Sequence, residues 1–136
     1  MREGRQDLSG GQGISGRQHL GRSNYHAGLA AEARIERLYC DRGHALLARR
    51  WRGKGGEIDL VFRKDDVISF VEVKQGRDFA RAAESLKPAQ ARRIFCAAEE
   101  FLASQPAGGM TECCFDVGLV DGTGACEIIE NALLLH

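Results

Sequence analysis

The sequence lacks several features that would assign it to a familiar class of protein. It has only 2 prolines in 136 residues, and no Walker pattern (GxxxxGK followed by Ser or Thr) for binding nucleotide phosphates. No apolar run approaches the roughly 18 residues of a membrane span, and the N-terminus lacks the apolar stretch of a secretory signal. We therefore expect a cytoplasmic protein with no membrane partner.

Charge and cysteine spacing give no strong signal either. The 19 basic and 19 acidic residues cancel to a formal net charge of zero, so an argument for nucleic-acid binding must rest on local patches. The 5 cysteines form no C-x-x-C pair, and no histidine lies at zinc-finger spacing. This pattern favours small, buried, reduced thiols over a metal or redox site. The 43% hydrophobic and 28% charged content is typical of a soluble globular protein.

Periodicity predicts one α/β domain over residues 24–136, preceded by a disordered tail rich in Gly, Ser, Arg and Gln over residues 1–23. Helical spacing of apolar residues indicates helices over 24–42 and 88–104. Runs with strand character occupy 45–48, two arms of a hairpin within 55–74, 112–120 and 125–129. The expected order is α-β-β-β-α-β-β, with an apolar tail over residues 131–136 that packs back on the domain.

The hairpin from Gly55 to Lys74 carries charges that a plain hairpin does not need. Asp59 lies inside the first apolar run, and Glu72 and Lys74 lie inside the second. Because side chains alternate along a strand, Glu72 and Lys74 share one face about 7 Å apart. Partly buried carboxylates need a paired cation or a metal, and Mg²⁺ favours carboxylate, water and phosphate oxygens. The alternative is a solvated face of an antiparallel sheet, on which alternating Glu and Lys are ordinary.

Two further groups of residues could join such a site. Glu32 borders the apolar stripe of the first helix and could reach the carboxylates, although its spacing alone favours a surface ion pair on the helix. Just before Asp59, a segment combines four basic residues with one aromatic: Arg49, Arg50, Trp51, Arg52 and Lys54. Arg and Lys bind backbone phosphates and a tryptophan can stack on a base, so the segment is a candidate nucleic-acid contact. A flexible basic turn with the tryptophan in the core is the alternative.

The order of elements, with Asp59 on the second strand and Glu72-x-Lys74 on the third, resembles the PD-(D/E)xK nuclease superfamily and its restriction-endonuclease-like core, a mixed sheet flanked by helices. Within it, residues 24–134 resemble the UPF0102 (YraN-like) family, which is related in fold to archaeal Holliday-junction resolvases. The residues that carry the resemblance are Gly28-x-x-x-Glu32, Gly56-Glu57-Ile58-Asp59-Leu60, Phe70-Val71-Glu72-Val73-Lys74, Phe115-Asp116 and Asn131-Ala132.

The resemblance implies a Mg²⁺- or Mn²⁺-dependent endonuclease that hydrolyses DNA, including branched or damaged DNA. It implies that Asp59, Glu72, Glu32 and the carbonyl of Val73 bind the metal and that Lys74 orients the attacking water. Gln90 is the candidate accessory residue on the following helix. Two alternatives stay open. One is a non-catalytic nucleic-acid-binding module on the same fold. The other is a structural adaptor, which could be a homodimer, that works through residues 132–135.

Overall fold

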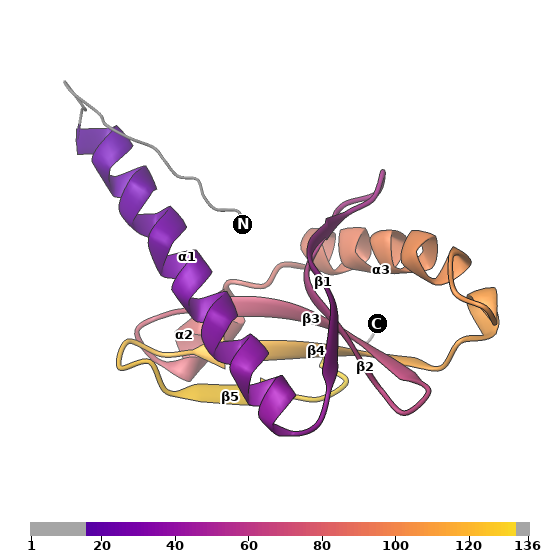
Figure 1. Cartoon of the computed structure of the whole chain (residues 1–136). Coiled ribbons are helices and arrows are strands. Elements are labelled where there is room, and N and C mark those ends of the chain that lie inside the picture. Colours follow the sequence, from indigo (N-terminus) through magenta and orange to yellow (C-terminus); the bar gives the residue numbers. More distant parts are fainter. Residues whose placement is uncertain (1–15, 133–136) are drawn as a thin grey trace.

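A five-stranded sheet and the helices around it make up the fold (Figure 1). The computed structural model describes the backbone of residues 16–132 and the side chains of residues 27–132. Of the expected C-terminal tail, residues 133–136 lie outside the described part of the chain. The elements are α1 (Gly16–Asp41), β1 (Ala45–Arg52), β2 (Glu57–Lys64), β3 (Val67–Gln75), α2 (Phe79–Glu84), α3 (Pro88–Ala103), the 3-10 turn η1 (Gly108–Met110), β4 (Cys113–Val120) and β5 (Cys126–Ile129).

The first helix is longer than the sequence pattern indicates. It begins at Gly16 instead of Asn24, so residues 16–23 are helical and do not belong to the expected disordered tail. Residues 17–24 contain no proline, and adding residues to an existing helix costs much less than nucleating one. Figure 1 shows this N-terminal part of α1 continuing beyond the sheet. Residues 1–15 lie outside the described part of the chain.

The strands lie in the order β1-β2-β3-β4-β5, and every neighbouring pair is antiparallel except β3 and β4. A parallel pair needs a crossover connection, and α2 with α3 supplies it. The mixed sheet flanked by helices confirms the predicted fold class. The short α2 was not predicted. It begins after Asp78, whose carboxylate accepts a 2.8 Å hydrogen bond from the backbone N–H of Arg81 and so caps the helix.

Two buried clusters of apolar side chains join the helices to the sheet. One holds α1 residues Ile35 and Tyr39 against Leu60, Phe62 and Val71. The other holds α3 residues, together with α2, against strands β2, β3 and β4; among its members are Val61, Phe70, Ala82, Ile94, Phe101 and Leu119. Because strand residues alternate between faces, neighbours such as Val61 and Phe62 serve different helices.

Gly118 on β4 sets how closely α1 approaches the sheet. A Cβ at Gly118 would lie 2.8 Å from Cγ2 of Ile35, closer than real side chains come. Ile35 is fully buried, and Glu32 lies on the same helix three residues earlier, which places it on the same face. The absence of a side chain at Gly118 therefore lets α1 bring Glu32 down to the end of the sheet.

Two predictions about the surface can also be compared with the structure. All 5 cysteines are free thiols, but Cys40 and Cys96 are exposed, so the expectation of uniformly buried thiols is wrong for these two. Cys40 and Cys96 lie on α1 and α3 outside the buried apolar stripes of these helices, so they are exposed although cysteine is usually buried. In the part of the chain that is described, no helix combines the length and the apolar character needed to cross a membrane.

Candidate functional site

The candidate site opens where β2 and β3 separate. Their last paired residues are Leu60 and Val71; beyond this point β2 pairs with β1, while β3 continues beside β4. Asp59 lies in the gap, and its Oδ2 accepts a 2.8 Å hydrogen bond from the backbone N–H of Val73. The N–H and C=O of one strand residue point toward the same neighbour, so the Val73 carbonyl faces the same gap. The carboxylate thus replaces a rung of the sheet between two diverging strands.

Glu72 and Lys74 enter the gap from β3, as alternation predicts. Glu72 is only 4% exposed, and its Oε2 lies 3.3 Å from Nζ of Lys74. The same oxygen accepts a 2.6 Å hydrogen bond from Nε2 of Gln90 on α3. The structure therefore brings the candidate accessory residue into direct contact with the candidate metal ligand. Burial of Glu72 is tolerated because Lys74 and Gln90 both contact its carboxyl oxygen.

The two central carboxyl groups hold protons more tightly than isolated ones. Burial is the main cause of a raised pKa at Asp59, and the Val73 N–H opposes the rise. The pKa of Glu72 is raised to about 8: burial is the largest cause, the negative charge of Asp59 adds to the rise, and Lys74 opposes it. Two carboxyl groups in this arrangement do not ionise together without help, and a bound cation would relieve the repulsion.

Glu32 reaches the site from α1 but is held by an arginine. Nε of Arg50 lies 3.0 Å from Oε1 of Glu32, and Nη2 lies 3.4 Å from Oε2. Burial raises the pKa of Glu32, the hydrogen bond from Arg50 opposes this rise, and the charge of Asp59 adds to it. The helix acid therefore lies close enough to Asp59 to sense its charge. Within residues 27–132, no three His, Cys, Asp or Glu side chains are gathered closely enough to form a ready-made metal cluster.

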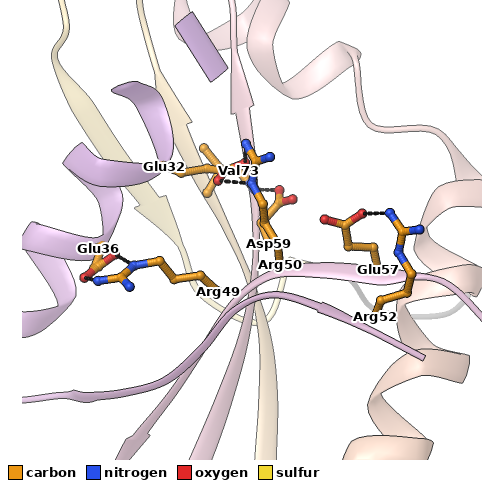
Figure 2. Close-up of polar contacts among 8 residues, drawn as sticks. All are labelled: Glu32, Glu36, Arg49, Arg50, Arg52, Glu57, Asp59 and Val73. Atoms are coloured by element: carbon orange, nitrogen blue, oxygen red, sulfur yellow. Dashed lines mark hydrogen bonds and ion pairs between the residues drawn. The ribbon is translucent and has the colours of Figure 1, made fainter. Parts of the chain in front are cut away.

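The basic segment differs from the sequence interpretation. Its first four residues belong to β1, which pairs with β2 as far as Arg52 opposite Glu57, so they do not form a turn. Three of its arginines bind carboxylates (Figure 2): Arg49 binds Glu36, Arg50 binds Glu32 and Arg52 binds Glu57. These acids lie on α1 and at the start of β2. A nucleic-acid role for the arginines stays a prediction, and it would require them to exchange these partners.

The rest of the segment is fixed against α3. Trp51 is half-buried, with its ring edge-on to Phe101 at a centroid distance of 5.4 Å. The backbone N–H groups of Lys54 and Gly55 each donate a 2.9 Å hydrogen bond to the carboxylate of Glu100. A Cβ at Gly55 would lie 2.7 Å from Cβ of Cys96, so this glycine permits close contact with the helix. The loop is thus docked, and the side chain of Lys54 remains exposed beside the site.

The carboxylates of Glu32, Asp59 and Glu72 line one cavity of about 230 Å³. It is lined by Glu32, Arg50, Glu57, Asp59, Glu72, Gln90, Arg93 and Ile94. Sequence reasoning missed Glu57 and Arg93 as members of the site. A periodicity signal was present for both: Glu57 precedes Asp59 by two residues on one strand, and Arg93 follows Gln90 by three residues on one helix.

The donor set suits a hard divalent cation. Mg²⁺ in proteins is held by one or two carboxylates and keeps waters or phosphate oxygens as its remaining ligands. Asp59 and Glu72 supply the two carboxylates, and the Val73 carbonyl faces the same gap. Glu32 lines the same cavity, where Arg50 holds its carboxylate. The residues present therefore fit the metal that the resemblance implies.

Comparison with known proteins identifies the family. The model described as "Uncharacterised protein family UPF0102" matches residues 31–120, which include Glu32, Asp59, Glu72, Lys74 and Gln90. The chain belongs to the UPF0102 family. A UPF0102 protein of Roseobacter denitrificans is 54% identical over 117 residues, covering 86% of this chain and 91% of the relative. One of Ruegeria pomeroyi is 58% identical over 112 residues (82% and 91%), and one of Dinoroseobacter shibae is 47% identical over 115 residues (85% and 86%).

Proposed function

We propose that this UPF0102 protein is a cytoplasmic, Mg²⁺- or Mn²⁺-dependent endonuclease that hydrolyses phosphodiester bonds in DNA. The observation that carries the proposal is the pairing of Asp59 and Glu72 across the gap between β2 and β3, with Lys74 at 3.3 Å from Glu72. A buried and a half-buried carboxylate beside one ammonium suit metal-assisted phosphoryl chemistry. The PD-(D/E)xK resemblance of the same residues supports this chemistry.

The residues divide the work as follows. Asp59 and Glu72 would hold the cation, which when bound would supply a water of lowered pKa and offset the charge that develops on the phosphate. Gln90 fixes the carboxylate of Glu72 through its 2.6 Å hydrogen bond. Lys74 is 17% exposed and can both orient the attacking water and face a phosphate oxygen. The hydrogen bond from Val73 keeps Asp59 from turning out of the gap.

DNA is the proposed substrate because basic side chains occur in the cavity and on the elements next to it. Arg93 lines the cavity, and Lys54 on the loop docked against α3, Lys87 at the N-cap of α3 and Arg92 in its first turns are exposed. Contacts of this kind bind backbone phosphates without reading sequence. A substrate recognised by its shape, such as a branched or damaged duplex, fits such a surface.

The test is cleavage of labelled single-stranded, duplex, flap and four-way-junction DNAs in Mg²⁺ or Mn²⁺. Asp59→Asn is compared with wild type and with Asp66→Asn, a control that alters an exposed carboxylate in the β2–β3 turn. We expect cleavage by wild type and the control, and none by Asp59→Asn or with a chelator. Equal cleavage by all three would overturn the proposal. Salt-dependent binding that survives in Asp59→Asn, without cleavage by any variant, would favour the non-catalytic module.

A further inference from the structure

We propose that Arg50 competes with the divalent cation for Glu32, so that Glu32 passes from Arg50 to the cation when the site is loaded. This inference rests on the metal-binding function proposed above. It makes Arg50 a positioning residue that sets cation affinity, a role distinct from contact with the substrate.

Arg50 occupies the carboxylate of Glu32, which could otherwise bind a cation in the cavity. Its guanidinium reaches both oxygens of Glu32, at 3.0 and 3.4 Å, and both side chains line the cavity that holds Asp59 and Glu72. The Glu32 side chain is 18% exposed and that of Arg50 is 35% exposed, so water only partly screens the pair. While the guanidinium holds both oxygens of Glu32, its positive charge disfavours a metal ion at the same oxygens.

The backbone of Arg50 shows that this contact is built into the strand. Its φ is 51°, in the left-handed region that residues other than glycine rarely occupy. In a regular strand, Arg49 and Arg50 would point to opposite faces. Here both reach α1: Arg49 binds Glu36, and Arg50 binds Glu32 one helical turn earlier (Figure 2). Unfavourable backbone conformations of this kind cluster at functional sites, where surrounding contacts hold them.

The cation and the guanidinium of Arg50 are both positive, so each disfavours the other in this cavity. A divalent ion between Asp59 and Glu72 would repel the guanidinium in the same cavity and attract the carboxylate of Glu32. Binding of the cation therefore weakens the hold of Arg50 on Glu32, and by reciprocity Arg50 weakens binding of the cation. Glu32 therefore stays bound to Arg50 in the metal-free protein and becomes available when a cation binds.

The experiment is calorimetric titration of the full chain with Mn²⁺. The variant is Arg50→Asn, because asparagine is neutral and tolerates the left-handed backbone. The matched control is Arg49→Asn, which removes the same charge from the neighbouring residue, whose partner Glu36 lies outside the cavity. We expect Mn²⁺ to bind Arg50→Asn about five- to tenfold more tightly than wild type, and Arg49→Asn within about twofold of wild type.

A second measurement observes the release directly. With Mg²⁺ added, the Nε–H nuclear magnetic resonance signal of Arg50 should shift as its bond to Glu32 is lost, while that of Arg49 stays in place. Unchanged or weaker Mn²⁺ binding by Arg50→Asn, with wild-type binding that depends on Asp59, would overturn this inference alone. Binding that is absent from wild type, or that persists in Asp59→Asn, would overturn the proposed metal site and this inference together.

Discussion

The backbone N–H of Val73 donates a 2.8 Å hydrogen bond to Asp59 just beyond the point where β2 and β3 stop pairing. This bond couples the shape of the sheet to the chemistry of the site. The strands stop pairing beyond Leu60 and Val71, and Asp59 closes the ladder that the separation interrupts. Glu72, one residue before Val73, is thereby held on the opposite side of the same gap.

Replacing Asp59 should separate cation binding from folding. The amide oxygen of Asp59→Asn can still accept the Val73 bond, and the variant removes a buried charge whose pKa burial raises. We expect its free energy of unfolding in urea at pH 8 to rise by about 1 kcal/mol. Mg²⁺ should raise the melting temperature of wild type and leave that of the variant unchanged. A loss of stability in Asp59→Asn would contradict this account, and Asp66→Asn should behave as wild type.

The pKa of Glu72 predicts how stability varies with pH. Because the folded-state pKa of about 8 lies above the ordinary value of 4.5, the folded protein binds the proton more tightly than the unfolded chain does. The stabilising contribution is complete below pH 4.5 and is lost as pH rises through 8.

Urea denaturation at pH 5, 6, 7 and 8 without metal measures this effect. Between pH 5 and pH 8 wild type should lose about 3 kcal/mol of stability through this group, and we expect Glu72→Gln to abolish that loss. The exposed Glu99→Gln on α3 should keep the wild-type pH dependence. If Glu72→Gln has the same slope as wild type, the carboxyl group of Glu72 is not the one that titrates.

The contact between Gly118 and Ile35 should be sensitive to a single methyl group. A Cβ at position 118 would lie 2.8 Å from Ile35, so Gly118→Ala must push α1 away from the sheet. We expect a loss of about 1–3 kcal/mol in the free energy of unfolding, the usual cost of overpacking a core. Gly109→Ala is the control, because no atom lies within 4 Å of a Cβ built there. Equal stability of the two variants would show that α1 is not seated by this contact.

The sequence predicted the centre of the site because the centre follows from local periodicity. Alternation along the hairpin places Glu72 and Lys74 on one face, and the structure brings them to 3.3 Å. The pattern could not reveal the partners of the arginines, since Glu32 and Glu36 lie 18 and 13 residues away from Arg50 and Arg49. Charge density alone indicated a basic surface, whereas tertiary packing turned that charge onto α1.

Backbone conformation was the other limit. Nothing in the letters Arg49-Arg50-Trp51 signals that β1 continues to Arg52 or that Arg50 has a φ of 51°. Gly55 and Gly56 make room for α3, because a Cβ at Gly55 would lie 2.7 Å from Cβ of Cys96 and one at Gly56 would lie 3.0 Å from Cβ of Arg93. A close approach of backbone requires glycine, and sequence does not show which partner approaches.

Glu100 should control the mobility of the loop beside the site. Its carboxylate accepts the N–H groups of Lys54 and Gly55, both at 2.9 Å. In Glu100→Ala, we expect the amide hydrogens of Lys54 and Gly55 to exchange about tenfold faster than in wild type, while those of β3 keep their protection. Glu99→Ala, the exposed neighbour, should leave all of these rates unchanged. Unchanged exchange at Lys54 and Gly55 in Glu100→Ala would mean that other contacts hold the loop.

The most direct test of the central claim is anomalous diffraction from crystals of the wild-type protein soaked in Mn²⁺. The account predicts a manganese peak in the gap between β2 and β3, within bonding distance of the carboxylates of Asp59 and Glu72, with Glu32 turned from Arg50 toward the ion. A structure in which manganese is absent from this gap at saturating concentration, or is bound only elsewhere, would contradict it.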